Sequence, residues 1–175
     1  GIAIADVLFG DFNPAGRLPF SVPRSVGQIP LYYNKKAPQS HDYVEMSASP
    51  LYPFGYGLSY TSFDYSDLHL SALMPRSFEI SFKVRNTGKY DGEEVAQLYL
   101  RDEYASVVQP LKQLKHFARF YLKRGEEREV KFILSEEDFS LVDRNLKKIV
   151  EPGTFQIMIG AASNDIRLQT KVEIK

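Results

Sequence analysis

The residues with the clearest chemical potential are four acidic clusters, Glu93-Glu94, Asp102-Glu103, Glu126-Glu127-Glu129 and Glu136-Glu137-Asp138. Two carboxyl groups about 5–5.5 Å apart across a sugar could act as nucleophile and acid/base in retaining glycoside hydrolysis. Neighbours along a strand point to opposite faces, however, so adjacency in sequence does not create such a pair. Most of these acids also lie beside Lys or Arg, which is typical of a solvated face, so we interpret the clusters as structural.

The histidines His41, His69 and His116 are the other acid–base candidates. They are scattered over loop and strand positions and lack the spacing of metal ligands. We therefore expect exposed or singly hydrogen-bonded histidines and no metal site. The chain has no cysteine, which excludes disulfides, thiolate nucleophiles and zinc–thiolate sites.

Residues 55–60, GYGLSY, begin like a dinucleotide-binding fingerprint but lack its third glycine, its preceding strand and its following helix. Ser59 lacks the final glycine of a nucleophile elbow and its strand–turn–helix setting. The sequence thus contains no complete catalytic constellation. We assign no catalytic residue and expect no cofactor.

Aromatic rings could still bind sugars by stacking. The chain has 11 Tyr and 12 Phe but no Trp, and Tyr or Phe on the strands of a β-sandwich more often belong to the core. The candidates that we favour for exposed sugar stacking therefore precede residue 61. They are Tyr32, Tyr33, Tyr52 and Tyr56.

The charge balance excludes two classes of partner. The 22 basic residues match the 22 acidic ones, so the chain lacks the basic footprint of a nucleic-acid binder and any bulk attraction to an anionic membrane. No apolar run approaches the roughly 18 residues that span a bilayer. The start has neither Met nor a basic leader, so we expect a cut inside a larger protein and not a signal peptide.

The composition changes near residue 60, which predicts two parts, 1–60 and 61–175. The first holds seven of the ten prolines and eight charged residues, and the second holds three prolines and 36 charged residues. Prolines at such short intervals remove strand and helix donors, so the first part cannot be a regular sheet or helix bundle by itself. The second part reads as a self-contained domain.

In the first part, the apolar segment Ile2–Phe9 predicts a short helix that Gly10 caps at its C-terminus. The helix has no N-cap residue, which again indicates a start inside a larger protein. We expect residues 17–23 and 28–34 to be extended. The aromatic stretch 51–60 should be pinned onto a surface.

The second part repeats the two-residue alternation of half-buried strands. We expect strands at residues 78–84, 94–101, 114–122, 130–134, 155–159 and 168–174, with the second of them buried on both faces as a central strand. Ser135 and Asp138 predict a capping box that opens a single helical turn. About seven short strands over roughly 110 residues, without a long helix, indicate an immunoglobulin-like or fibronectin type III-like β-sandwich.

Six blocks of the chain resemble the C-terminal end of glycoside hydrolase family 3 β-glucosidases, in the family's order. Three blocks are similar to the end of its second domain: ADVLFGDFNPAGRLP (5–19), QIPLYYN (28–34) and PLYPFGYGLSYTSF (50–63). The other three are similar to its fibronectin type III-like domain: DGEEVAQLYL (91–100), LKQLKHF (111–117) and EPGTF (151–155). The resemblance covers essentially the whole chain. It implies a mainly β fold, in which the sandwich follows the remnant of an α/β domain.

The resemblance also implies a function: an exo-acting, retaining β-glycosidase, built from a (β/α)8-barrel, an α/β sandwich and this β-sandwich. The family's Asp nucleophile and acid/base Glu would both precede Gly1. The chain would then be the non-catalytic C-terminal part, which packs against and stabilises the upstream catalytic domains. The parent enzyme would act on a β-glycoside in the periplasm or outside the cell.

The alternative function is that of a carbohydrate- or cell-wall-binding module, which would need a planar row of exposed aromatic side chains on one sheet face. Residues 1–60 cannot bury their apolar faces alone, so we expect them to contact the sandwich or a second copy of the chain in a dimer. In the parent enzyme the aromatic stretch should lie at the junction of the second and third domains. Tyr52 and Phe54 are the candidates there for contact with substrate.

Overall fold

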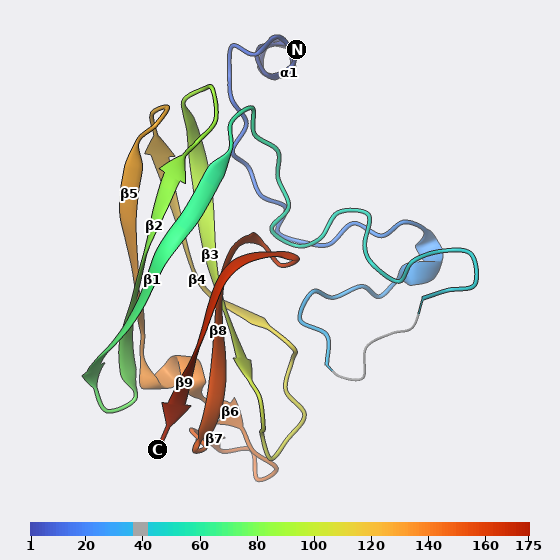
Figure 1. The fold of residues 1–175 in the computed structure, drawn as a ribbon. Helices are drawn as coiled ribbons and strands as arrows, with labels where there is room; N and C mark the ends of the chain where they lie inside the picture. The colour runs from blue at the N-terminus through green and yellow to red at the C-terminus, as the bar shows by residue number, and fades with distance from the viewer. Residues whose placement is uncertain (37–41) are drawn as a thin grey trace.

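The computed structural model of the chain describes residues 1–36 and 42–175. Its body is a sandwich of two antiparallel sheets, and the first sixty residues pass along one side of it and project away (Figure 1). The expected fold class is confirmed: the chain is mainly β, a fibronectin type III-like sandwich with a short helix before it.

The sandwich consists of a three-stranded and a four-stranded sheet. The first, in the order β1-β2-β5, contains β1 (Phe63–Met74), β2 (Ser77–Asn86) and β5 (Glu127–Leu134). The second, in the order β4-β3-β8-β9, contains β3 (Gly92–Asp102), β4 (Gln113–Leu122), β8 (Gly153–Ala162) and β9 (Asp165–Ile174). A short hairpin, β6 (Leu141–Val142) and β7 (Lys148–Ile149), lies beside them.

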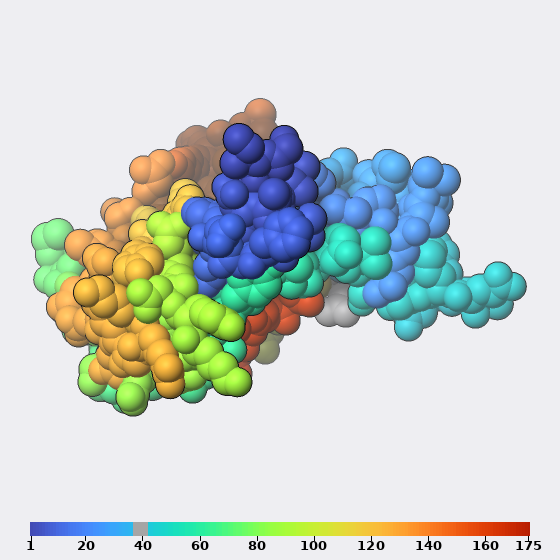
Figure 2. Space-filling model, turned by 90° about the horizontal axis from the view of Figure 1, so that it is seen from above, coloured from blue at the N-terminus to red at the C-terminus, as the bar shows by residue number. Residues whose placement is uncertain are grey.

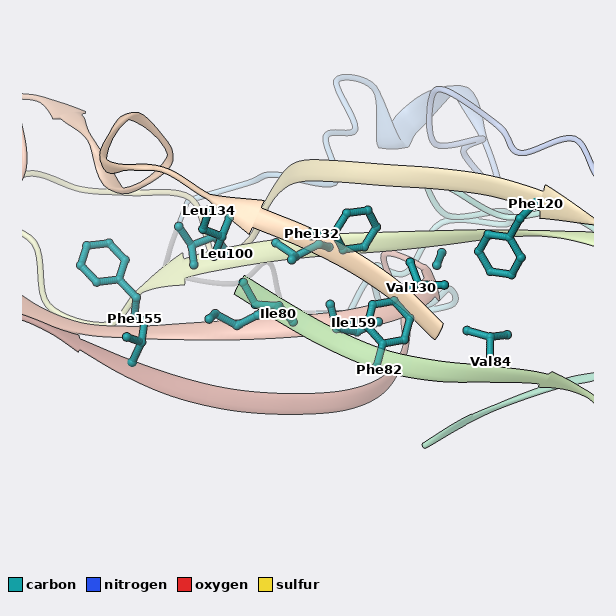
Figure 3. Packing of buried hydrophobic residues seen from close by; sticks show 14 of the residues in the cluster. Ile80, Phe82, Val84, Leu100, Phe120, Val130, Phe132, Leu134, Phe155 and Ile159 are labelled. Atoms are coloured by element: carbon teal, nitrogen blue, oxygen red, sulfur yellow. The ribbon is translucent and has the colours of Figure 1, made fainter. Parts of the chain in front are cut away.

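The core lies between the two sheets. Alternate residues of β2 and β5 point inward, and they meet alternate residues of β3 and β8 from the opposite sheet (Figure 3). Aromatic rings contribute to this core. Phe82 packs 5.8 Å from Phe132 of the same sheet, and Phe139 packs 5.1 Å from Phe155 of β8, centroid to centroid. The two-residue alternation in the sequence thus corresponds to the inner faces of a closed sandwich.

Strand β3 is buried on both faces, as expected for a central strand. Ala96, Leu98 and Leu100 face the core. Gln97 and Tyr99 point the other way and yet are only 3% and 0% exposed. Another part of the chain must therefore cover the outer face of this sheet.

Strand β1 was not among the expected strands because its pattern is irregular. Its pairing with β2 shifts register between Ser66 and His69, where Asp67 has a positive φ of 53°. This irregularity breaks the alternation of buried residues that would mark a strand in the sequence. Tyr65, before the shift, and Leu70, after it, both pack against the core. The end of the strand is exposed.

The capping predictions are confirmed. Helix α1 (Ile2–Phe9) ends at Gly10, whose φ of 86° allows its amide to bind the Val7 carbonyl. Ser135 and Asp138 form the predicted capping box of the 3-10 turn η2 (Glu136–Phe139). No side chain of α1 is buried by the described residues, and the helix lies over the end of the sandwich (Figure 2).

The structure corrects the prediction for residues 28–34. Gln28 ends a 3-10 turn, η1 (Val26–Gln28), and Tyr33 and Asn34 lie in a turn, not in an extended segment. The Gln28 side chain stabilises the 3-10 turn, because it accepts the Arg24 amide at 2.5 Å and donates to the Ser47 carbonyl at 3.0 Å. Residues 18–22, in contrast, pair with residues 51–56 through Leu18 and Val22, and the backbone bends at residues 19 and 20 between them.

Replacing Phe82 or Phe155 with Ala should each lower the free energy of unfolding by about 3–5 kcal/mol, because each empties a packed aromatic site. Phe117→Ala is the matched control: Phe117 is 67% exposed, whereas Phe82 and Phe155 are 1% and 2% exposed. The control should change stability by no more than about 0.5 kcal/mol. Urea unfolding followed by circular dichroism measures all three, and equal effects at the three positions would contradict the assigned core.

Candidate functional site

Two stretches of the first sixty residues pair to form a narrow ribbon. We define the ribbon as residues 18–22 together with residues 51–56. Leu18 donates its amide to the Tyr56 carbonyl at 2.9 Å and accepts the Gly55 amide at 2.8 Å. Further along, Val22 donates to the Tyr52 carbonyl at 2.8 Å. These backbone bonds hold the aromatic stretch in place, and a turn at Phe54 and Gly55 is closed by the Tyr56 amide, which donates to the Pro53 carbonyl at 3.1 Å.

The ribbon covers the outer face of β3 and β8. The Ser163 amide donates to the Phe54 carbonyl at 2.9 Å, and Gln97 Nε2 approaches the Gly55 carbonyl at 3.4 Å. The same Nε2 donates to the Ala161 carbonyl at 2.6 Å. The prediction that the aromatic stretch is pinned onto a surface is confirmed, and that surface is the sandwich itself.

Beneath the ribbon lies a buried polar pair. The Tyr99 hydroxyl donates to Gln97 Oε1 at 2.5 Å, so both ends of the Gln97 amide are engaged. Burial raises the pKa of Tyr99, because the phenolate would lose its hydration there. At neutral pH the phenol stays protonated and remains a donor.

Two of the predicted aromatic candidates are used for docking. The Tyr33 and Phe54 rings stack with centroids 4.0 Å apart, and Tyr33 packs edge-on against Tyr99 at 6.2 Å. The Tyr33 hydroxyl accepts the Leu114 amide at 3.2 Å. One face of the Phe54 ring is thus covered by Tyr33, so this side chain fixes the ribbon.

Tyr52 and Tyr56 form a second ring pair on the ribbon. Their centroids lie 4.9 Å apart with an interplanar angle of 34°. Tyr52 is 41% exposed, whereas Tyr56 is half-buried. Tyr32 is also exposed. The structure therefore leaves Tyr52 and Tyr32 accessible among the sequence candidates, while Tyr33 and Phe54 are packed against each other.

The glycines of GYGLSY serve close packing. Gly55 has a φ of +82° and faces the side chain of Gln97, and a Cβ at Gly57 would collide with the Gly16 carbonyl oxygen and the Arg17 guanidinium. Ser59 has a structural role as well, since its hydroxyl donates to Asn13 Oδ1 at 3.0 Å. These contacts account for the motif without phosphate or nucleophile chemistry.

Asn13 links the turn after α1 to the sandwich. Its Oδ1 also accepts the Tyr60 amide at 2.8 Å, and its Nδ2 donates to the Asp91 carbonyl at 2.9 Å. The Tyr60 hydroxyl donates to the Val7 carbonyl of α1 at 2.5 Å. Between α1 and the end of the sandwich lies an open groove of about 670 Å³, lined by rings that include Phe9, Tyr60 and Tyr121.

The acidic clusters do not form a pair of catalytic carboxylates. Glu93 lies on the outer face of β3 and pairs with Arg119, whereas its neighbour Glu94 points inward and is buried, as strand geometry requires. The remaining clusters are engaged in surface contacts. Their partners include Lys171 for Glu103, Lys83 for Glu127, Lys131 for Glu129, Arg76 for Glu136 and Lys148 for Glu137.

Glu94 is the residue that the sequence interpretation missed. Its Oε2 lies 3.0 Å from Arg17 Nη2, and its Oε1 accepts the Tyr65 hydroxyl at 3.0 Å. Burial raises the pKa of Tyr65 well above its ordinary value, and the charge of Glu94 and the hydrogen bond to it raise it further. An acid at the start of an otherwise apolar strand was the available signal, because such a group must be paired inside the fold.

His69 matches the interpretation as an exposed histidine, whereas His116 does not, because its Nε2 is buried and has no hydrogen bond within the described part of the chain. His69 is exposed on β1, and His116 Nε2 lies 3.5 Å from Asp138 Oδ2, while His41 lies outside the described residues. Over residues 1–36 and 42–175, the structure shows no group of three or more His, Asp or Glu side chains arranged for a metal ion. No helix in the same ranges is long and apolar enough to cross a membrane.

Two family models match the chain in succession. Residues 1–60 match the glycosyl hydrolase family 3 C-terminal domain, and residues 94–163 match the fibronectin type III-like domain. A periplasmic beta-glucosidase of Salmonella typhimurium is 46% identical over 95% of the chain, and a beta-xylosidase of Formosa agariphila is 45% identical over 97%. The chain spans 24% of the length of each of these relatives.

The fold has a close match among solved structures. A β-glucosidase from Erythrobacter marinus superposes with a TM-score of 0.92 at 42% identity. The match covers 99% of this chain and 23% of that protein. Both the sandwich and the segment before it are therefore arranged as in that enzyme.

Gly57→Ala should loosen the ribbon, because its Cβ would collide with backbone at Gly16. Overpacking of this kind typically lowers the free energy of unfolding by about 1–3 kcal/mol. Because the ribbon would open more often, hydrogen exchange at the Leu18 and Gly55 amides should accelerate. Gly16→Ala is the matched control, since nothing lies within 4 Å of a Cβ there and neither glycine has a positive φ. Equal exchange rates in both variants would show that the ribbon does not need this close approach.

Proposed function

This chain belongs to glycosyl hydrolase family 3, and we propose that it is the non-catalytic C-terminal part of a β-glucosidase-like enzyme that hydrolyses terminal β-D-glycosides with retention. The observation that carries the proposal is the interlocking of the two matched domains. Residues of the family 3 C-terminal domain cover the outer face of β3 in the sandwich. The sandwich and the preceding domain are therefore a single packed body, suited to supporting catalytic domains upstream.

Helix α1 supports this role. Seven of its eight residues are apolar, and Ile2, Ile4, Leu8 and Phe9 are exposed. A helix that is apolar on most sides is ordinarily buried in a larger core. We propose that its partner is the upstream catalytic part of the same protein, and a second copy of the chain is the alternative occupant.

The names of the relatives support a proposal for the substrate class and for the cellular compartment of the parent enzyme. They include beta-glucosidases and beta-xylosidases, so the proposed substrate class is a β-linked terminal glucose or a close analogue. The Salmonella typhimurium relative is a periplasmic protein. We propose a periplasmic or extracellular parent enzyme on that basis.

A carbohydrate- or cell-wall-binding module is the second candidate function, and the outer faces of the sheets argue against it. The centre of the four-stranded sheet is covered by the ribbon. The outer face of β2 carries Glu79, Ser81, Lys83 and Arg85, which offer no aromatic platform. Phe117 and Tyr121 are exposed on edge strand β4, but the Tyr121 hydroxyl is bonded to Asp91 at 2.8 Å.

Within the parent enzyme, we propose that Tyr52 lies beside the sugar. Its ring is partly exposed and steadied by Tyr56, which suits stacking on the apolar face of a pyranose. Phe54 is the other proposed contact. Because its ring is stacked on Tyr33, only its uncovered face or edge could meet a substrate.

The 175-residue chain alone should not hydrolyse aryl β-glucosides, because retaining hydrolysis needs both a nucleophile and an acid/base, and the family resemblance implies that both precede Gly1. Release of nitrophenol above a buffer blank measures this. The same polypeptide extended upstream to the full length of its relatives should be active. Turnover by the short chain, abolished by replacing one acid within it, would contradict the proposal.

In the extended enzyme, Tyr52→Ala should lower kcat/KM roughly 2- to 12-fold, the equivalent of losing about 0.5–1.5 kcal/mol of ring stacking. Tyr43→Ala is the control, since Tyr43 is comparably exposed and also lies in the part of the chain that precedes the sandwich. Steady-state kinetics on an aryl β-glucoside separates the two. Equal kcat/KM values in both variants would remove Tyr52 from the substrate site.

A further inference from the structure

A buried ion pair lies at the base of the ribbon. Glu94 on β3 is 3% exposed and its partner Arg17 is 12% exposed, with 3.0 Å between Oε2 and Nη2. Arg17 immediately precedes Leu18, the first paired residue of the ribbon. The ion pair thus joins the start of the ribbon to the central strand of the sandwich.

The polar atoms around this pair are bonded mostly to one another. The second oxygen of Glu94 accepts Tyr65, and the other guanidinium nitrogen of Arg17 lies 3.3 Å from the Gly16 carbonyl. Arg167 lies 5.0 Å from the centre of the Tyr65 ring and pairs with Asp165 at 2.9 Å. In the cavity of about 520 Å³ beside them, Arg17, Glu94 and Arg167 thus all have partners already, which disfavours a ligand site on these charges.

Both parts of the chain contribute side chains to this cluster. Glu94, Tyr65 and Arg167 belong to the sandwich, and Arg17 belongs to the segment before it. A buried carboxylate that loses its cation is strongly destabilising, because its hydration is not recovered. Without Arg17, the buried carboxylate of Glu94 would therefore lack its cationic partner at this end of the sandwich core.

We propose that Arg17 is a positioning residue, whose ion pair with Glu94 fixes the base of the ribbon on the sandwich and thereby sets the place of the Tyr52 ring. The significance of Tyr52 rests on the proposed function, whereas the positioning of the ribbon does not. Gly57 supports the arrangement, because a side chain there would collide with the Gly16 carbonyl oxygen and with the Arg17 guanidinium. The backbone bonds of Leu18 and Val22 then carry the alignment along the ribbon to Tyr52.

Arginine is suited to this position. Its planar guanidinium can donate to Glu94 and to the carbonyls of Ala15 and Gly16 at once, at 3.0, 3.5 and 3.3 Å. A lysine ammonium is a point charge on a flexible stem and would keep the charge without this fork. Arg17→Lys should therefore retain stability in part and position the ribbon less firmly.

The test is a double-mutant cycle in the full chain with Arg17→Met, Glu94→Gln and both together. Arg17→Met should lower the urea midpoint and accelerate hydrogen exchange at the Leu18 and Gly55 amides at least tenfold more than at Phe132 in the core. Glu94→Gln should lower the midpoint in the original chain. In the Arg17→Met background it should raise the midpoint, because it removes the unpaired charge. Arg17→Lys should give intermediate exchange at the ribbon amides.

Arg119 and Glu93 provide the matched control on the same strand. Arg119 is 54% exposed and Glu93 is 32% exposed, so water weakens this ion pair much more than it weakens the buried one. Arg119→Met and Glu93→Gln should show small additive effects and unchanged ribbon exchange. Additive effects at Arg17 and Glu94, or ribbon exchange that rises only in step with Phe132, would overturn the proposal. None of these readouts uses sugar hydrolysis, so a failure of the proposed function would be recognised separately.

Discussion

The packing of the sheets and the ribbon depends on one constraint, which is that both faces of the central strand β3 must be covered. Strand β3 has Leu98 and Leu100 on the side of the core and Gln97 and Tyr99 on the other side, and all four are buried. The three-stranded sheet covers the first side. The ribbon covers the second, where it also satisfies the Ser163 amide and approaches the amide nitrogen of Gln97.

This constraint ties the two compositional parts of the chain together. Residues before 61 are rich in proline and poor in charge, and residues after it alternate as strands do. Their packing does not separate at that point, because Tyr33, Phe54 and Arg17 all contact the sandwich. The division into 1–60 and 61–175 remains a prediction about domains, and the contacts indicate that the sandwich has its full burial only with the ribbon in place.

The same contacts separate two roles among the aromatic side chains. Rings on the sandwich side of the ribbon, Tyr33 and Phe54, stack on each other and against Tyr99. Tyr52, which packs against Tyr56, is 41% exposed. The packing of Tyr33 and Phe54 on the sandwich thus fixes the position of the accessible Tyr52 ring. A supporting domain could contribute such a ring to a sugar site that other domains mainly form.

The sequence by itself determined the features that depend on neighbouring residues. Alternation gave five strands of the core and the doubly buried β3, Gly10 marked the helix end, and Ser135 with Asp138 marked a turn. These are set by backbone geometry and local hydrogen bonds, which act within a few residues.

Only the tertiary structure decided which polar and aromatic groups meet. Nothing local to Glu94 reveals that Arg17, 77 positions away, pairs with it, or that Gly57 lies against the Arg17 side chain. Strand β1 was hidden for a related reason, since a register shift at Asp67 is stabilised by pairing with β2 and leaves no regular alternation. Burial and charge pairing depend on distances across the fold, and a linear pattern does not contain those distances.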